Sequence, residues 1–303
     1  MSSPLNANLI TRARIIEAIR AFFAGRGYLE VETPCRIPAP IPEADIFPQP
    51  SGGWFLQTSP EVCMKRLLCR GFTRIFQICK VFRRHERGRK HLPEYTLLEW
   101  YRRDADYRDL MRETQALIRF VADALDRPGF LSYQGNDIDL SGEWPRVTVS
   151  QALDRFAGVK LDAGLTAERF NELMIEAVEP NLGLENPVFI CDYPADIGCA
   201  LARLKADDPR YAERFELYIG RLELCNGFSE LSGSHEYRIR FEKARRQLER
   251  TVASGPPLPE TFLADMDHLP PAAGNALGID RLAMLFCDTD DISNVIAFAP
   301  EDL

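Results

Sequence analysis

Two apolar runs joined by a basic segment constrain the fold of this chain more than any other feature. Phe72–Phe82 and Tyr95–Tyr101 are rich in aromatic and β-branched residues, a composition typical of β-strands. The segment between them, Arg83–Glu94, is polar and mostly basic. Because the two runs are close in the sequence, the pattern predicts a pair of antiparallel strands joined by a long charged loop.

Helices and further strands are predicted around this pair. Thr11–Ala24 is predicted to be an amphipathic helix, because Ile15, Ile19 and Phe22 recur at helical spacing. The other predicted helices are one from Glu61 to about Arg70 that has Pro at its first position, one over 105–126, helical stretches near Val149–Phe156 and Ala167–Val178, and helices over Tyr237–Val252 and Arg281–Phe286. Strands are predicted over Tyr28–Glu32 and Phe215–Leu224, and a Pro- and Gly-rich loop over 36–53.

This order predicts an α+β fold in one domain over residues 1–303. Strands that pair locally are joined later by strands from distant parts of the chain, which indicates a mixed, mainly antiparallel sheet flanked by helices. The stretch over roughly 104–212 carries little recognisable chemistry and is predicted to be a mainly helical insertion.

Composition narrows the possible functions. With 303 residues, of which 46% are hydrophobic and 27% charged, the chain can bury one large core. Its net charge of −8 argues against broad affinity for nucleic acid or acidic membranes. No apolar stretch approaches the roughly 18 residues of a membrane span, and the N-terminus lacks the pattern of a secretory signal. We therefore expect a cytoplasmic protein with no membrane partner.

The basic segment allows two interpretations. Arg83 stands at the end of a predicted strand, where a guanidinium can hold a phosphate oxygen in a fixed, forked geometry. The dense charge of the segment is equally compatible with a solvated surface loop. Composition alone leaves both possibilities open.

Two further segments carry polar groups within apolar sequence. Glu223, Asn226 and Glu230 interrupt an apolar run, and buried carboxylates are costly without a cation nearby. Magnesium bound to ATP phosphates would be such a cation, and it needs only one or two carboxylate ligands. Exposed glutamates on an edge strand would explain the same pattern. Downstream, Gly278 permits close approach of a ligand to the backbone, and Arg281 opens an apolar helix.

The order of these segments resembles motifs 1, 2 and 3 of the class II aminoacyl-tRNA synthetases. Details are similar to the lysyl branch: Thr58-Ser-Pro-Glu61, His91-x-Pro-Glu-Tyr-Thr-Leu-Leu-Glu-Trp-Tyr101, Arg214-Phe-Glu-Leu-Tyr218, Glu223-Leu-x-Asn-Gly-Phe-x-Glu230 and Leu277-Gly-Ile-Asp-Arg281. Motif 1 begins close to residue 1, which leaves no room for an anticodon-binding domain. In this respect, and in Glu99-Trp-Tyr-Arg102 and Val295-Ile-Ala-Phe-Ala299, the chain resembles the elongation factor P lysine ligases.

The resemblance implies a site for ATP, Mg²⁺ and lysine. It assigns the α-phosphate to Arg83 and the γ-phosphate to Arg281, which are the implied catalytic residues. The further implied ATP-binding residues are His85, Glu86, His91, Tyr95, Glu223, Leu224 and Gly278, and the implied magnesium ligands are Glu223 and Glu230. The implied residues for the amino acid are Ser59, Glu61, Glu99, Tyr101, Asn226 and Glu230. A carboxylate and a phenol suit a buried ammonium group, which must be paired when it leaves water.

The basic segment departs from the family pattern at two positions. The family has Phe-Arg-Asn-Glu where this chain has Phe82-Arg-Arg-His85, so that Glu86 comes one place late. The Asn that follows the loop histidine in the family is Leu92 here. Either Glu86 moves into the site through a changed loop, or nucleotide binding is weaker.

By resemblance, the expected activity is adenylation of lysine or (R)-β-lysine and its transfer to a lysine side chain of elongation factor P. A homodimer built on the helix and strand of motif 1 is also expected, whereas tRNA is not an expected partner. Two alternatives remain open: a minimal ligase that loads another acceptor (a tRNA, a carrier protein or a small amine), and a non-catalytic paralogue that senses an amino acid or a nucleotide.

Overall fold

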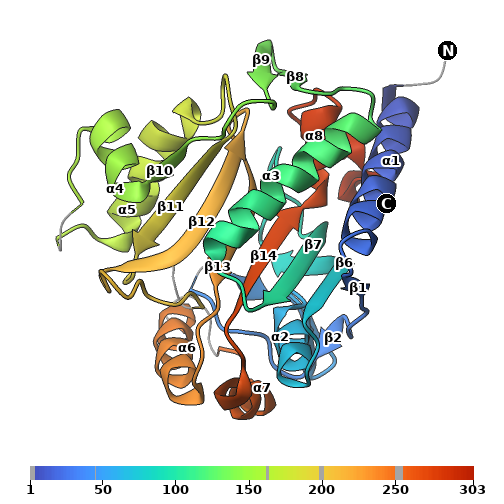
Figure 1. Cartoon of the computed structure of the whole chain (residues 1–303). Coiled ribbons are helices and arrows are strands. Elements are labelled where there is room, and N and C mark those ends of the chain that lie inside the picture. Colours follow the sequence, from blue (N-terminus) through green and yellow to red (C-terminus); the bar gives the residue numbers. More distant parts are fainter. Residues whose placement is uncertain (1–3, 45, 162–163, 198–200, 250–254) are drawn as a thin grey trace.

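A mixed sheet runs through the centre of the molecule (Figure 1). The structure, a computed structural model, describes residues 4–44, 46–161, 164–197, 201–249 and 255–303. The strands lie in the order β1 (Leu29–Glu30), β6 (Arg74–Arg84), β7 (Glu94–Arg103), β14 (Ala272–Gly278), β13 (Leu222–Ser229), β12 (Tyr211–Ile219), β11 (Val188–Pro194) and β10 (Arg146–Thr148), and β3 (Phe47–Pro48) pairs with β6. Smaller sheets are formed by β2 (Arg36–Ile37), β5 (Trp54–Leu56) and β4 (Pro50–Ser51), and by β8 (Phe130–Tyr133) and β9 (Asn136–Asp139).

The predicted α+β class and sheet type are confirmed. β6 and β7 pair in antiparallel register over nine residues, from Arg74 opposite Arg102 to Phe82 opposite Glu94. The pairs from β7 through β14, β13 and β12 to β11 are antiparallel as well, whereas β1 pairs with β6 and β10 with β11 in parallel. Strands from both ends of the chain therefore meet at the centre of one sheet.

The two faces of the sheet have different environments. Helices α1 (Pro4–Ala24), α3 (Tyr107–Ala124) and α8 (Ile279–Phe286) pack against one face, where side chains such as Leu98, Trp100 and Leu277 form the main core with them (Figure 1). The opposite face is partly open. Such a division is common in antiparallel sheets, because alternate side chains along each strand point to opposite faces.

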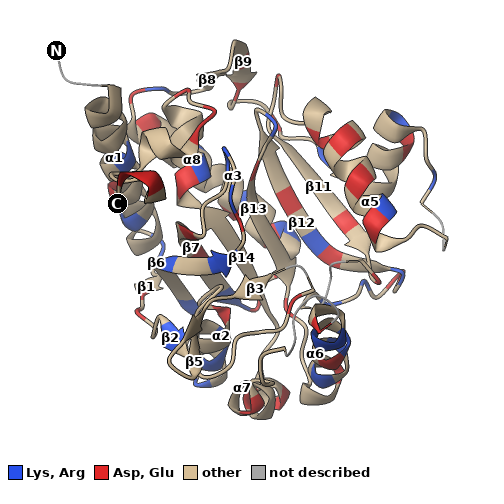
Figure 2. Cartoon of the chain, turned by 180° about the vertical axis from the view of Figure 1, so that it is seen from behind, with Lys and Arg blue, Asp and Glu red and all other residues tan. Residues whose placement is uncertain are grey.

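The remaining helices lie around the other edges of the sheet. They are α2 (Glu61–Cys69), α4 (Val149–Ala152), α5 (Ala167–Leu173), α6 (Ser234–Leu248) and α7 (Glu260–Asp265), with π-helical turns at Leu153–Ala157 and Met174–Val178 and 3₁₀ turns at Glu179–Asn181, Met266–His268, Ile292–Val295 and Pro300–Asp302. Lys and Arg are numerous on α6 (Figure 2), but several are paired, Arg238 with Glu260 and Arg240 with Glu236. No helix in the described ranges combines the length and the apolar character that a membrane span requires.

The strand predicted over Phe215–Leu224 is wrong in its extent, because the segment forms a hairpin. β12 ends at Ile219 and β13 begins at Leu222, with Gly220 and Arg221 between them. Both turn residues have positive φ, 58° and 64°, as in the two-residue turn whose twist matches that of the paired strands. The continuous apolar character of the segment hid the turn.

Other predicted boundaries shift as well. The loop expected over 36–53 contains the short strands β2, β3 and β4. Pro60 stands at the N-cap of α2 rather than at its first position. α6 ends at Leu248, and the end predicted at Val252 lies outside the described residues. The stretch over 104–212 has the three expected helical segments, and it also adds β10 and β11 to the main sheet.

A buried ion pair ties the N-terminal helix to the start of α8. Arg12 lies 2.6 Å from Asp280 Oδ1, and their side chains are 13% and 2% exposed. Asp280 Oδ2 accepts a 2.7 Å hydrogen bond from the backbone N–H of Thr96, and Arg12 donates to the hydroxyl of Thr96. The pair therefore holds α1, β7 and α8 together directly beside Arg281.

We expect Arg12→Met to lower the free energy of unfolding by about 3 kcal/mol, because it leaves a buried carboxylate without its cation. Urea denaturation followed by circular dichroism measures the change. Arg20→Met is the matched control: Arg20 pairs with Glu30 at 2.9 Å, but the side chains are 51% and 39% exposed, so the expected loss is below about 1 kcal/mol. Equal losses in the two variants would contradict the prediction.

Candidate active site

A cavity of about 770 Å³ opens on the face of the sheet opposite α1, α3 and α8. Alternate residues of neighbouring strands line it, which follows from the two-residue period of a strand. These residues are Tyr95 and Leu97 of β7, Ala276 and Gly278 of β14, Asn226 and Phe228 of β13, and Arg214, Glu216 and Tyr218 of β12.

Small residues of β14 leave room above the centre of the sheet. Gly274, Ala276 and Gly278 alternate on the cavity face, opposite Tyr101, Glu99 and Leu97 of β7. A Cβ atom at Gly274 would lie 2.4 Å from the Tyr101 ring and 2.5 Å from Glu230 Oε1, whereas a Cβ at Gly278 would meet nothing nearer than 3.9 Å. Gly278 thus borders open space. Gly274 instead lets Tyr101 and Glu230 pack closely against the backbone, a role that the sequence analysis did not identify.

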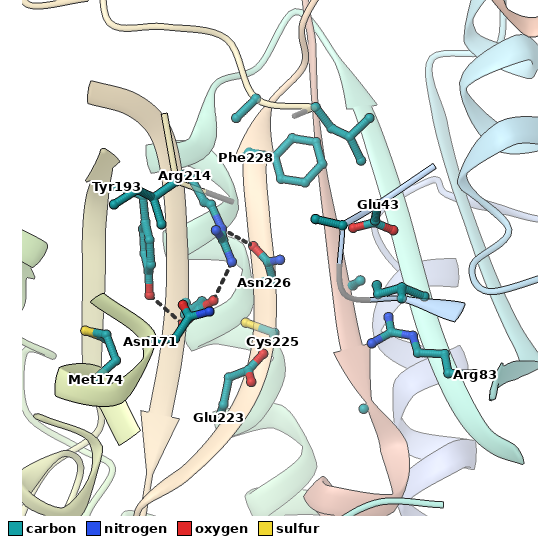
Figure 3. A pocket seen from close by; sticks show the side chains of 18 of the residues that line it. Glu43, Arg83, Asn171, Met174, Tyr193, Arg214, Glu223, Cys225, Asn226 and Phe228 are labelled. Atoms are coloured by element: carbon teal, nitrogen blue, oxygen red, sulfur yellow. Dashed lines mark hydrogen bonds and ion pairs between the residues drawn. The ribbon is translucent and has the colours of Figure 1, made fainter. Parts of the chain in front are cut away.

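A β-bulge directs Glu223 toward the cavity. Leu217 pairs with Cys225 and Tyr218 pairs with Glu223, so that Leu224 is an extra residue in β13. In a regular strand, Glu223 and Asn226 would point to opposite faces, since they are separated by an odd number of positions. The bulge places both on the cavity wall, as Figure 3 shows.

Arg281 is held at one end of the cavity by contacts with Glu223, His91 and the backbone oxygen of Lys90. Its Nη1 donates to the backbone oxygen of Glu223 at 2.8 Å and lies 3.3 Å from Glu223 Oε2, and its Nη2 lies 2.5 Å from His91 Nε2. Burial and the neighbouring Arg281 lower the pKa of His91, which favours the neutral imidazole. Lys90 also lines this end.

Arg83 lines the same cavity from the end of β6. Its guanidinium lies over the ring of Tyr95, 5.3 Å from the ring centre, and contacts Glu86 Oε1 at 3.4 Å. The Nε of Arg83 is buried without a hydrogen-bond partner in the described structure. Arg83 and Arg281, far apart in the chain, therefore face one cavity.

Most residues predicted to bind ATP reach this cavity. Those that line it are Arg83, Glu86, His91, Tyr95, Glu223, Leu224, Gly278 and Arg281, together with Asn226 from the amino acid set. His85 does not line it; the residue is exposed, has a positive φ of 73°, and places its ring edge-on to Phe47. Leu92 is buried and lines the wall.

The other residues predicted to bind the amino acid form a buried acidic cluster beside the cavity. Ser59 Oγ donates to Glu99 Oε1 at 2.5 Å, and the Tyr101 hydroxyl donates to Glu99 Oε2 at 2.8 Å. Ser59 and Glu61 also line a small adjoining hollow. Burial raises the pKa of Glu99 to about 8, with Glu61 nearby adding to the effect.

Lys65 lies inside this cluster and was missed by the sequence analysis. The side chain is fully buried; its Nζ lies 2.5 Å from Glu230 Oε2 and also contacts Glu61. Burial alone would lower the pKa of Lys65, but Glu230 and Glu61 raise it well above its usual value. Burial, opposed by Lys65, raises the pKa of Glu230 to about 8. The sequence feature that could have identified Lys65 is its position four residues after Glu61 in a predicted helix, a spacing at which two side chains can form an ion pair.

A second buried network, around Arg214, was also missed. Arg214 donates to Glu216 Oε1 at 2.6 Å and to Asn226 Oδ1 at 3.0 Å, and its guanidinium stacks over the Tyr193 ring (Figure 3). The hydroxyls of Tyr193 and Tyr218 both donate to Glu216 Oε2. The alternation of polar residues in 214–218 was the available signal, and this network joins β11, β12 and β13 at the cavity wall beside Asn226.

Comparison with known proteins places the chain in a family. The family described as tRNA synthetases class II (D, K and N) matches residues 1–302. The chain therefore belongs to the class II tRNA synthetases.

Several curated relatives carry the same name. An elongation factor P–(R)-β-lysine ligase of Pectobacterium carotovorum is 41% identical, over 97% of this chain and 95% of its own length. A ligase of the same name from Sodalis glossinidius is 41% identical, over 99% of this chain and 97% of its own length. Another, from Proteus mirabilis, is 40% identical, over 96% of this chain and 94% of its own length. The chain matches these ligases over nearly their whole length.

The raised pKa of Glu99 predicts a pH dependence of stability. The folded protein keeps this proton up to about pH 8, whereas the unfolded chain loses it near the usual value of 4.5, so stability falls as the pH rises between these values. We expect Glu99→Gln to make the slope of unfolding free energy against pH less steep by about 1.4 kcal/mol per pH unit.

Urea denaturation between pH 5.5 and 7.5 measures this slope. Glu32→Gln is the control, because Glu32 is exposed and its replacement removes the same charge. An unchanged slope in Glu99→Gln would show that Glu99 is ionised in the folded protein at these pH values.

Proposed function

We propose that this protein is an ATP-dependent ligase that adenylates lysine or (R)-β-lysine and transfers it to a lysine side chain of elongation factor P. The observation that carries the proposal is the joint placement of Arg83 and Arg281 on one cavity, beside a buried cluster of carboxylates. The names of the relatives support the acceptor and the amino acid.

In the activation step, the carboxylate of the amino acid attacks the α-phosphorus of ATP and pyrophosphate leaves. Arg83 binds the α-phosphate and Arg281 the γ-phosphate, so that both guanidiniums neutralise charge that develops in the transition state. Tyr95, beneath Arg83, stacks on adenine, and His91 and Gly278 border the triphosphate. Arg281 needs no large rearrangement for this role, because Glu223 and His91 already hold it.

The chemistry of two side chains suits Mg²⁺. Glu223 presents carboxylate oxygens to the cavity beside Arg281, and Glu230 Oε1 is buried with no hydrogen-bond partner within the described ranges. Magnesium prefers oxygen ligands and binds with one or two carboxylates plus substrate phosphates. We assign it to Glu223 and Glu230, where it would neutralise phosphate charge.

The acidic cluster selects a substrate that carries amino groups. Glu61, Glu99 and Glu230 converge there, and Lys65 offsets only part of their charge. An ammonium group of lysine or β-lysine would supply the missing positive charge and favour ionisation of Glu99. Ser59 and Tyr101 donate hydrogen bonds to Glu99, and Asn226 lies two strands away across the sheet.

The position of Glu86 bears on nucleotide binding. Glu86 lines the cavity and contacts Arg83, whereas His85 is turned away from it. This arrangement supports the alternative in which Glu86 takes the place of the glutamate that the family has at the position of His85. It therefore favours an active ligase over a non-catalytic paralogue that senses an amino acid.

The test measures amino-acid-dependent exchange of pyrophosphate into ATP and transfer of radiolabelled (R)-β-lysine and lysine to purified elongation factor P. We expect both activities in the wild type. Arg281→Ala should lower the exchange rate by about 10²-fold or more, because it removes a charge that stabilises the transition state. Labelling of bulk tRNA instead of elongation factor P, or no exchange with any amino acid, would reject the proposal.

Arg238→Ala serves as a control for that experiment. It removes an arginine from α6 that pairs with Glu260 on the surface, so its exchange rate should match the wild type. A comparable loss in both variants would show that the effect of Arg281→Ala is not specific to the cavity.

We also propose a homodimer. The stripe Ile15, Ile19 and Phe22 belongs to the core of the single chain, so it cannot form the interface. The edge strand β1 is a better candidate, because Leu29 is 51% exposed there and one edge of β1 has no partner strand in the described structure. Light scattering at micromolar concentration should give twice the mass of 34.4 kDa, and Leu29→Asp should lower it. A monomeric wild type would contradict the proposal.

A further inference from the structure

The site described above has no assigned group to receive the proton that leaves when an amine attacks the acyl-adenylate. Glu43 lies in the segment between β2 and β3 and has no role in the activation step. Among the described residues, it alone lines both the large cavity and the small hollow beside Ser59 and Glu61. Figure 3 shows Glu43 on the same side of the cavity as Arg83, facing the wall that carries Asn226 and Glu223.

This junction is where the reacting carbonyl has to lie. In an acyl-adenylate, the carbonyl carbon is bonded to an oxygen of the α-phosphate on one side and to the amine-bearing part of the amino acid on the other. Under the proposed function, Arg83 binds the phosphate and the cluster with Glu61 binds the amine. The carbonyl therefore falls between the two hollows, at the level of Glu43.

We propose that Glu43 is the general base of the transfer step, a role that rests on the proposed function. In that step the nitrogen of the acceptor lysine forms a bond to the carbonyl carbon. The bond between that carbon and the phosphate oxygen breaks, and AMP leaves with the electron pair. Two protons leave that nitrogen in all, because the free acceptor lysine is an ammonium ion. The carboxylate of Glu43 accepts a proton from it and passes it to water, and the other proton goes directly to water.

The surroundings of Glu43 suit a group that exchanges protons. Its side chain is partly buried and has no hydrogen-bond or ion-pair partner among the described residues, so the carboxylate is not committed to another contact. Burial raises the pKa of Glu43 to about 7. The charged groups that face it are Arg83 on β6, Glu61 and Lys65 on α2, and Arg214 on β12; Glu61 raises the pKa further and the three cations lower it.

A base with this pKa is effective at neutral pH, because it is substantially ionised and still binds a proton well. Transfer should therefore accelerate as the pH rises through about 7. By contrast, Glu99 and Glu230 are engaged by Ser59, Tyr101 and Lys65 and are less free to accept a proton.

The test separates activation from transfer. In single-turnover experiments with preformed, enzyme-bound adenylate and elongation factor P, Glu43→Gln should lower the transfer rate by about 10²-fold or more. It should also abolish the rise in rate near pH 7, while ATP–pyrophosphate exchange stays within a few-fold of the wild type. Glu32→Gln removes the same charge from an exposed position that lines neither hollow, and it should change neither rate.

Two further measurements guard against a purely structural effect. Hydroxylamine is already neutral at pH 7 and needs no base, so Glu43→Gln should transfer the acyl group to hydroxylamine as fast as the wild type does. Glu43→Asp keeps a carboxylate and should retain the rise in rate near pH 7. If Glu43→Gln keeps the wild-type transfer rate, if it loses exchange and transfer together, or if Glu43→Asp behaves like Glu43→Gln, the proposal is overturned. A wild type that lacks exchange would instead overturn the proposed function.

Discussion

The two-residue alternation of the central sheet is the constraint on which the rest of this structure depends. In β7, Leu98 and Trp100 point toward α1, α3 and α8, while Tyr95, Leu97, Glu99 and Tyr101 point the other way. Any slip of one residue would bury the polar set in the core and expose the apolar one. The same alternation that stabilises the fold therefore places polar groups along one open face.

Local departures from this alternation shape the cavity. The bulge at Leu224 turns Glu223 onto the same face as Asn226, and Gly274 lets Tyr101 and Glu230 approach the floor of the site. The buried pair of Arg12 and Asp280 supports the start of α8 immediately before Arg281. The position of Arg281 is thus set by packing at the back of the sheet as well as by its own contacts with Glu223 and His91.

The site divides into a cationic part and an anionic part. Arg83, Arg281 and Lys90 line the cavity, which suits a polyphosphate, whereas Glu61, Glu99 and Glu230 surround Lys65 in the adjoining cluster, which suits an ammonium group. Glu86 and Glu223 offset part of the charge of the two arginines, and Lys65 offsets part of the charge of the glutamates. A ligand of opposite charge would balance the rest in each part. Under the proposed function, a substrate that joins an amine to an adenylate would satisfy both parts at once, and its reactive carbonyl would lie between them, near Glu43.

Ordered motifs made much of this predictable from the sequence. The two strands joined by the basic segment were predicted from their apolar runs, and their antiparallel pairing followed because the runs are close in the sequence. The resemblance in motif order identified Arg83, Tyr95, Gly278 and Arg281, and all four line the cavity. The hairpin turn at Gly220 and Arg221 was not predicted, because apolar residues on both sides made two strands look like one.

The sequence by itself determined the class of fold, the family and the residues that carry the main charges, since these depend on local periodicity and on motifs within short segments. Only the tertiary structure decided that Lys65 pairs with Glu230, that Arg214 joins Glu216 and Asn226, and that Glu43 borders both hollows. Those contacts join residues from separate strands, helices and loops. The packing of the whole sheet determines which of them meet, and no local pattern in the chain records it.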